Sequence, residues 1–449
     1  MGRRLWIGPW LVVGAVLLAT LPARGESPKM LETLELGIET EMHWALGTGR
    51  GNTQQAELIF QPSLKLDLSE DVRLTAIGRL RTDAVDELEP GDPTPREVSR
   101  LSRRGLIGNQ TDIELRELYV ETTFRRTYLT LGKQQIVWGK ADGLKVLDVV
   151  NPQDFREFIL NDFEDSRIPL WALNAEIPIG EAVLQLLWLP DPSYHEIPED
   201  DALYAFMIPE LSPRVPPGVA LDLLPIRRPR RIISDSDAGV RLSRLWNGWD
   251  LTLNYLYHYE DVPVPFRTLS LTPSGPLVTV TPEYERTHLL GGTFSNAFGD
   301  LTLRGEVGYS TDRHFATRAP TDRDGIVESG ELLYVLGFDW YELPETLLSL
   351  QIFQSWVVDD ESGMIRDDLV TTATFLAQRR AMNDQLVLEF IWLHNLDHSD
   401  GLIRPSVVYD LSDELKLRAG ADLFYGSRHG LFGQFDRNDR VSLSLEWSI

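Results

Sequence analysis

The sequence closes with the stretch Val441-Ser442-Leu443-Ser444-Leu445-Glu446-Trp447-Ser448-Ile449, in which apolar and polar side chains alternate without exception. Every odd position is apolar, and every even position is Ser or Glu. A β-strand turns successive side chains to opposite faces, so this pattern places all the apolar side chains on one face of a sheet. A sheet in water normally covers such a face, whereas a barrel in a bilayer exposes it to lipid. The stretch therefore predicts a strand of a membrane barrel.

Similar runs precede this stretch and bring the number of predicted strands to about 18. The predicted strands cover residues 34–46, 58–68, 72–81, 113–124, 128–138, 170–177, 182–190, 236–245, 249–259, 283–295, 301–310, 330–340, 346–357, 368–380, 385–394, 402–411, 415–425 and 438–449. Connections of hairpin length alternate with long connections rich in Asp, Pro, Gly and Ser. The long connections cover residues 47–57, 82–112, 139–169, 191–235, 260–282, 311–329, 358–367, 395–401 and 426–437.

This alternation of loop lengths is typical of outer-membrane barrels, which have short periplasmic turns and longer extracellular loops. We therefore predict an all-β fold, a transmembrane antiparallel up-and-down β-barrel with periplasmic termini. Its closure requires pairing between the last run and the first, residues 34–46. The alternatives are a soluble β-sandwich and a propeller, but neither explains the regular loop lengths, and no repeat of about 40 residues is visible.

The N-terminus has the features of an export signal. Arg3 and Arg4 precede an apolar stretch, and Ala23-Arg24-Gly25 supplies small residues for cleavage before Glu26. We predict a signal peptide at 1–25, a barrel at 26–449 and localisation in the bacterial outer membrane. A membrane anchor is the alternative, although Gly8 and Pro9 interrupt a short apolar core.

Composition excludes several classes of function. The formal charge of −25 argues against nucleic-acid binding, which requires a basic face. The absence of cysteine excludes disulfide scaffolds, thiolate metal sites and cysteine nucleophiles. The partners expected for a barrel are outer-membrane lipid and lipopolysaccharide, together with the machinery that assembles barrels.

The faces opposite the apolar stripes carry many charges, which suits a water-filled lumen better than a packed core. Arg73, Arg79 and Arg81 form a ladder on one run, and acids on neighbouring runs could set a field across the pore. The alternative is that these charges only pair with one another. The predicted pore-lining residues of the strands are Glu35, Glu39, Arg73, Arg79, Arg81, Glu117, Glu121, Lys416 and Arg418.

The connection 139–169 is the candidate constriction of this pore. It mixes dense charge with many apolar side chains, so we predict that it folds into the lumen. The alternative is a loop packed outside on the rim. Asn151-Pro152 is expected to begin a short helix through Phe158. The predicted constriction residues are Lys140, Asp142, Asp148, Asp154, Arg156 and Arg167.

The same region carries a resemblance to known proteins. Leu131-Gly132-Lys133-Gln134-Gln135-Ile136-Val137-Trp138-Gly139, followed by Asp148-Val149-Val150-Asn151-Pro152, resembles a family of large bacterial outer-membrane barrels, mostly of unknown function. The family is similar in general shape to the 18-strand alginate-export barrel. The resemblance is strongest over residues 115–175, and it implies a porin-like or export channel without naming a substrate.

The leading functional prediction is a channel for passive passage of a small or medium-sized solute. One alternative is an export conduit that works with an inner-membrane transporter and a periplasmic partner. Another is a barrel enzyme, for which His288 and the pair His394-Asn395 are the candidates, since triads assemble by geometry rather than spacing. No cofactor and no metal are predicted, although Asp322-Arg323-Asp324-Gly325 resembles a fragment of a calcium loop.

Overall fold

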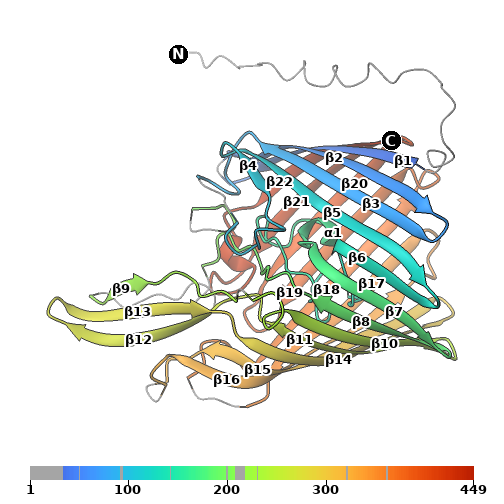
Figure 1. Ribbon diagram of the computed structural model, residues 1–449. Coiled ribbons are helices and arrows are strands. Elements are labelled where there is room, and N and C mark those ends of the chain that lie inside the picture. The colour runs from blue at the N-terminus through green and yellow to red at the C-terminus, as the bar shows by residue number, and fades with distance from the viewer. Residues whose placement is uncertain are drawn as a thin grey trace, which may run out of the picture.

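The computed structural model describes residues 34–49, 51–91, 95–141, 143–198, 201–207, 218–229, 231–319, 322–359 and 363–449 (Figure 1). The predicted signal peptide at 1–25 and the predicted constriction residue Asp142 lie outside these residues.

Eighteen antiparallel strands form one closed barrel, as the sequence predicts. The strands are β1 (Leu34–Gly47), β2 (Thr53–Ser69), β3 (Val72–Asp83), β5 (Thr111–Phe124), β6 (Thr127–Gln134), β7 (Leu170–Ile179), β8 (Ala182–Leu189), β10 (Asp237–Trp246), β11 (Trp249–Tyr259), β14 (Arg286–Phe298), β15 (Leu301–Ala316), β16 (Ile326–Trp340), β17 (Thr346–Val357), β18 (Leu369–Ala381), β19 (Leu386–Asn395), β20 (Asp400–Ser412), β21 (Leu415–Tyr425) and β22 (Arg440–Ser448). Each strand pairs with the next along the chain, apart from the short elements described below. The short turns gather at one end of the barrel, the turn end, and the long connections at the other, the loop end (Figure 1).

The first and last strands close the sheet. β1 and β22 pair antiparallel, with Trp44 opposite Leu443 and Thr40 opposite Trp447. The backbone N–H groups of Ile38 and Ile449 each donate to the other residue's carbonyl oxygen at 3.0 Å. The closure predicted from the terminal alternation is confirmed, and the closed sheet has no free edge in its wall.

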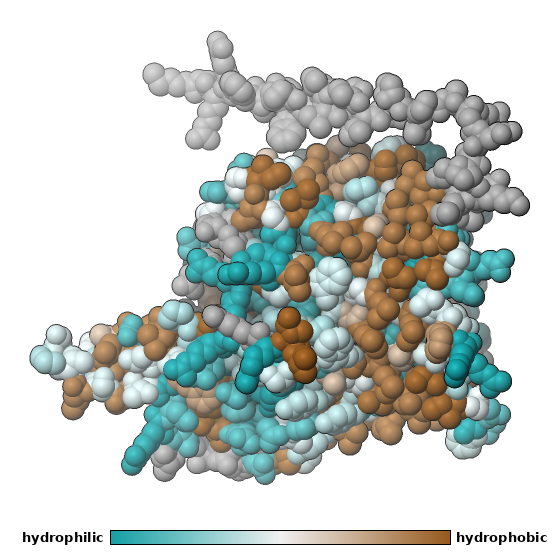
Figure 2. All heavy atoms as spheres, in the orientation of Figure 1, coloured by the Kyte–Doolittle hydropathy of each residue, from teal (hydrophilic) through white to brown (hydrophobic). Residues whose placement is uncertain are grey.

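The outer face of the barrel is apolar. Val441, Leu443 and Trp447 of β22 are 47%, 43% and 38% exposed, and Figure 2 shows hydrophobic side chains covering much of the strands on the visible face. Ser444 and Glu446, on the opposite face of β22, line a cavity inside the barrel. No helix among the described residues is long and apolar enough to cross a membrane.

The two faces of β22 should lose different amounts of stability when a charge is added. Leu443→Arg places a cation against lipid and is expected to destabilise the barrel by about 2–4 kcal/mol if the site lies near the bilayer midplane. Ser444→Arg, one residue further on, adds the same cation to the lumen side and should cost far less. Urea unfolding in lipid vesicles measures both variants. Equal losses would contradict the assignment of the two faces.

The long connections contain structure that the sequence analysis did not predict. β12 (Val264–Thr272) and β13 (Gly275–Glu283) form a hairpin within the predicted loop 260–282, and β9 (Ala220–Leu223) pairs parallel with β13. This three-stranded sheet projects from the loop end (Figure 1). β4 (Gly105–Ile107) adds a short pairing to β5. Several strand ends also differ, and β6 ends at Gln134 rather than near residue 138.

The helix predicted to begin at Asn151-Pro152 is absent, and that prediction was wrong. The described segment has one short helix, α1 (Phe163–Ser166), further along the chain. The Asn151 side chain is occupied with tertiary contacts instead. Its Oδ1 accepts from the Ile136 amide at 2.7 Å, and its Nδ2 donates to the Ile168 carbonyl at 2.9 Å. A side chain that satisfies distant backbone groups is not available to cap a helix of its own.

Candidate functional site: the barrel lumen

Residues 139–141 and 143–169, which we call the segment, lie against the inward-facing side chains of the strands. Leu147 is fully buried and packs with Leu256, Leu289 and Val335 of β11, β14 and β16. Gly308 of β15 makes room for it, since a Cβ atom there would lie 3.0 Å from a Leu147 methyl group. This packing anchors the beginning of the segment to one side of the barrel wall.

Glu306 of β15 holds the backbone of the same region. Its carboxylate accepts hydrogen bonds from the amides of Lys140, Ala141 (2.8 Å) and Leu147 (3.0 Å). One buried acid thus satisfies three backbone donors near the beginning of the segment. Buried backbone groups require such partners, so Glu306 helps to specify the course of the chain.

A second contact fixes the middle of the segment to β2 and β3. The Arg156 guanidinium contacts both oxygens of Glu57, at 2.8 and 3.2 Å, and both side chains are almost completely buried. Arg81 lies 3.6 Å from the same carboxylate and pairs with Asp112 at 2.8 Å. The two-point geometry of an arginine and a carboxylate sets orientation as well as proximity. We call the Arg156–Glu57 pair the clasp.

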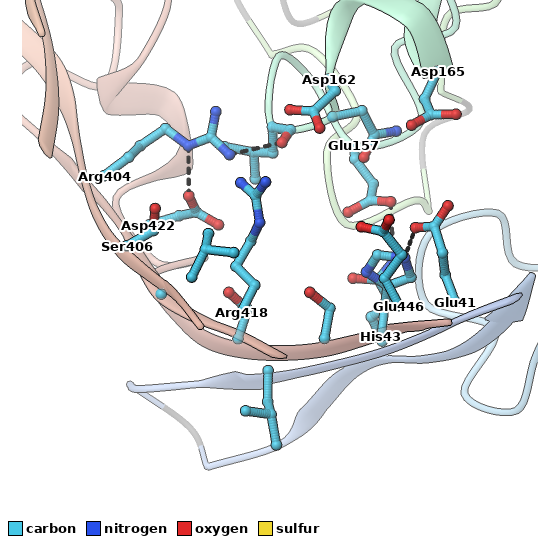
Figure 3. A pocket seen from close by; sticks show the side chains of 18 of the residues that line it. Glu41, His43, Glu157, Asp162, Asp165, Arg404, Ser406, Arg418, Asp422 and Glu446 are labelled. Atoms are coloured by element: carbon cyan, nitrogen blue, oxygen red, sulfur yellow. Dashed lines mark hydrogen bonds and ion pairs between the residues drawn. The ribbon is translucent and has the colours of Figure 1, made fainter. Parts of the chain in front are cut away.

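A third group of charges joins the segment to the closing strands. Arg440 of β22 contacts Glu157 at 3.1 Å and Asp422 of β21 at 2.7 Å. Arg404 of β20 contacts Asp422 at 2.8 Å and donates to the Leu160 carbonyl oxygen at 2.7 Å. Figure 3 shows Arg404 and Asp422 facing one another at the border of the cavity described next. The segment is therefore bound to the wall on both sides.

Near the start of the segment, Asp148 pairs with Arg167 at 2.7 Å and with Lys145 at 3.2 Å. Burial lowers the pKa of Lys145 to about 8, and the nearby positive charge of Arg167 also lowers it. Asp148 opposes this shift without cancelling it. The surroundings of Lys145 are therefore poorly solvated.

A cavity of about 490 Å³ lies between the segment and strands β1–β3 and β18–β22. Its lining includes ten carboxylates and seven Arg or Lys side chains. Glu41 and His43 of β1 lie in contact at 2.7 Å, near Glu446 and Glu157 (Figure 3). Such dense charge within a barrel requires water or partners, and ion pairs join many of these side chains.

The predicted arginine ladder has three different surroundings. Arg73 lies near the turn end and pairs with Asp67 at 2.6 Å, where both are substantially exposed. Arg79 lines the cavity and pairs with Asp165 of the segment. Arg81 is buried among Glu57, Asp112 and Glu89. The three side chains share a face of β3 but do not form one uniform row of free charges.

The other predicted residues are distributed over the whole inner surface. Glu35 lies opposite Lys65 in register, Glu39 accepts from Gln61, Glu117 accepts from Gln135, Glu121 lies opposite Arg73, Lys140 pairs with Asp250, Asp154 lies 3.9 Å from both Arg81 and Arg104, and Lys416 pairs with Glu446. Arg418 lines the cavity and is exposed to it. The cavity brings together Arg79, Arg81, Asp154, Arg156, Lys416 and Arg418. Their role in conduction stays a prediction.

Five side chains that organise this site are not among the predicted pore-lining and constriction residues: Glu57, Glu157, Arg404, Asp422 and Arg440. The alternation of inward and outward positions places Asp422 on the same face as Lys416 and Arg418, and it contained a signal for three of the others. Arg404 and Arg440 lie two residues before the inward positions Ser406 and Ser442. Glu57 lies on the same face of its strand as Lys65, but the predicted strand began at residue 58, whereas β2 begins at Thr53.

The candidates for enzyme chemistry do not form a catalytic set. Nδ1 of His394 contacts the Tyr425 hydroxyl at 2.9 Å, and Nδ1 of His288 contacts the Tyr255 hydroxyl at 2.8 Å. Asn395 instead accepts from the amides of Asp397 and His398. Within the part of the chain that the structure describes, no group of three or more His, Asp or Glu side chains could hold a metal ion.

Comparisons with known proteins agree with the barrel. A family model described as "Protein of unknown function (DUF1302)" matches residues 106–402, and no curated protein matches the chain in sequence. The structure is similar to OccAB2 of Acinetobacter baumannii, with 10% identity, a TM-score of 0.54, and coverage of 94% of this chain and 99% of that one. It is also similar to the outer membrane protein OpdK of Pseudomonas aeruginosa, with 11% identity, a TM-score of 0.51, and coverage of 93% and 99%. At such identities the similarity shows a shared porin-like outer-membrane β-barrel fold.

Proposed function

The chain belongs to the DUF1302 family of proteins of unknown function, and from its lumen we propose that it is a porin-like channel for a small or medium-sized solute. One observation carries the proposal, namely the charged cavity that lies inside the 18-strand barrel and is bordered by residues 154–165. A barrel of this strand number is wide enough for an aqueous path unless a segment narrows it. Residues 139–169 are the proposed constriction.

The lining charges support a preference for cations. Ten carboxylates face seven Arg or Lys side chains around the cavity, and the chain as a whole is strongly acidic. Rings of acidic side chains favour cations in channels generally. The proposed mechanism is diffusion past the segment, with selectivity set where the two signs of charge are least balanced.

We propose an outer-membrane location, reached through cleavage of a signal peptide at 1–25. The apolar outer face and the shared fold support this location. Outer-membrane lipid, lipopolysaccharide and the barrel-assembly machinery are the proposed partners. We propose no enzymatic activity, since transport requires only a path and a field.

Planar lipid bilayers test the proposed function. The purified barrel is expected to produce discrete current steps in KCl, with a reversal potential in a salt gradient that indicates K⁺ preference. A folded barrel that inserts but never conducts would overturn the channel proposal. A preference for Cl⁻ would leave the channel intact but contradict the charge argument. The heat-dependent migration of barrels on gels provides the independent check that the protein is folded.

A further inference from the structure

A second cavity, of about 420 Å³, lies on the other side of the segment, against β11 and β14–β16. Its lining is mostly apolar and includes Val149, Phe155, Phe158, Phe163, Phe206 and Leu333. Side chains from residues 153–166 are divided between the two cavities, and Asn161 lines both. The segment therefore divides the lumen into a charged compartment and an apolar compartment.

The cations of the apolar compartment already have partners. Lys145 contacts Asp148 at 3.2 Å and Gln153 Oε1 at 2.6 Å. Arg313 of β15 contacts Glu331 at 3.2 Å and Glu260 at 3.6 Å. An anionic ligand would have to displace these carboxylates, so the compartment is poorly suited to bind one.

Its acids, by contrast, retain unused acceptor capacity. The Asp261 carboxylate lies 3.9 Å from Nδ1 of His195, but that nitrogen accepts the Gln153 amide at 2.9 Å and has no proton to donate. Oδ1 of Asp148 is buried and has no hydrogen-bond partner among the described residues. Burial, and then the charge of Asp237, raises the pKa of Asp261 well above its usual range, and the nearby charge of Arg313 opposes this shift without cancelling it, so a further cation would stabilise the ionised carboxylate.

We infer that this compartment binds an amphipathic organic amine, with an apolar or aromatic body against the phenylalanines and a protonated amino group facing Asp261. Aromatic rings and carboxylates are the two groups that recognise such cations in proteins. The inference rests on the proposed channel function, and it identifies the class of solute. From this compartment the amine would pass Asn161 into the charged cavity, where carboxylates outnumber cations.

Binding to the full barrel in detergent micelles tests the inference with three probes of one shape: 2-phenylethylamine, 2-phenylethanol and phenylacetate. Calorimetry is expected to rank the amine first and phenylacetate last. Asp261→Asn should weaken binding of the amine about tenfold, the effect of losing a hydrogen bond to a charged group. Asp222→Asn, an exposed acid of the projecting sheet, is the matched control and should change nothing.

The outcomes separate the inference from the channel proposal. Equal or tighter binding of phenylacetate overturns the inference, as does an Asp261→Asn variant that keeps full affinity for the amine. A barrel that conducts without preferring the amine contradicts only the inference. A barrel that binds the amine as expected but never conducts supports the binding site and overturns the channel proposal. Heat-dependent migration of Asp261→Asn on gels shows that the variant is folded, whether or not the barrel conducts.

Discussion

Arg156→Met is expected to release residues 139–169 from the wall and to raise the mean single-channel conductance. The substitution leaves Glu57 buried, with Arg81 at 3.6 Å and Gln55 at 3.0 Å as its remaining contacts. Removing one partner of a buried ion pair typically costs about 3–5 kcal/mol. If the segment moves away, water can reach the Glu57 carboxylate. The segment should therefore detach from the wall while the barrel itself stays folded.

Two further variants test this explanation. Adding Glu57→Gln to Arg156→Met removes the uncompensated charge. The mean single-channel conductance should then return most of the way to that of the unmodified protein. Arg244→Met breaks a pair with Glu181 that lies exposed at the turn end, where such pairs are worth about 0–1 kcal/mol, and should leave conductance unchanged. Single-channel recordings at fixed voltage measure all three. If Arg156→Met conducts like the unmodified protein, the segment does not limit the current.

The barrel could be predicted because its signals are local. The alternation from Val441 to Ile449 and the short connections each depend on a few neighbouring residues, and together they determine strand number and closure. The period of two also separates the lipid face from the lumen face along each strand. Nothing in such a pattern depends on the rest of the fold.

The partners within the lumen could not be predicted in this way. Arg156 and Glu57 are 99 residues apart, and Arg440 and Glu157 are 283 apart. The alternation along a strand shows that a side chain points inward. Which side chain it contacts depends on the register of the whole sheet. The missing helix at Asn151 has the same origin, because tertiary contacts overrode a local capping signal.

The hairpin β12–β13 was missed for a different reason. Its residues are rich in Thr, Pro, Ser and Gly, and composition assigned them to a loop. The alternation of Val278 and Val280 with threonines was present but short. A strand pair that leaves the barrel wall has no lipid-facing stripe to mark it, so loop composition outweighed the pattern.

Arg418→Glu is expected to increase the preference for K⁺ over Cl⁻ by about fivefold. This factor corresponds to roughly 1 kcal/mol, the interaction energy of two unit charges about 4 Å apart in water. Arg418 of β21 faces the charged cavity, and no ion pair of its own is found among the described residues. The substitution reverses a charge that the lumen does not neutralise. The reversal potential in a KCl gradient measures the change, and high salt should reduce it.

Arg126→Glu, in the exposed turn between β5 and β6, is the matched control and should shift the reversal potential much less.

A comparison of Arg418 with Arg81 separates selectivity from stability. Arg81 is buried among four acids, so its neutralisation should weaken the barrel without a comparable change in selectivity. Selectivity depends on charges that ions can approach, whereas stability depends on charges that are already paired. An Arg81→Gln barrel that remains stable and shifts selectivity more than Arg418→Glu would show that ions pass closer to the clasp than to Arg418.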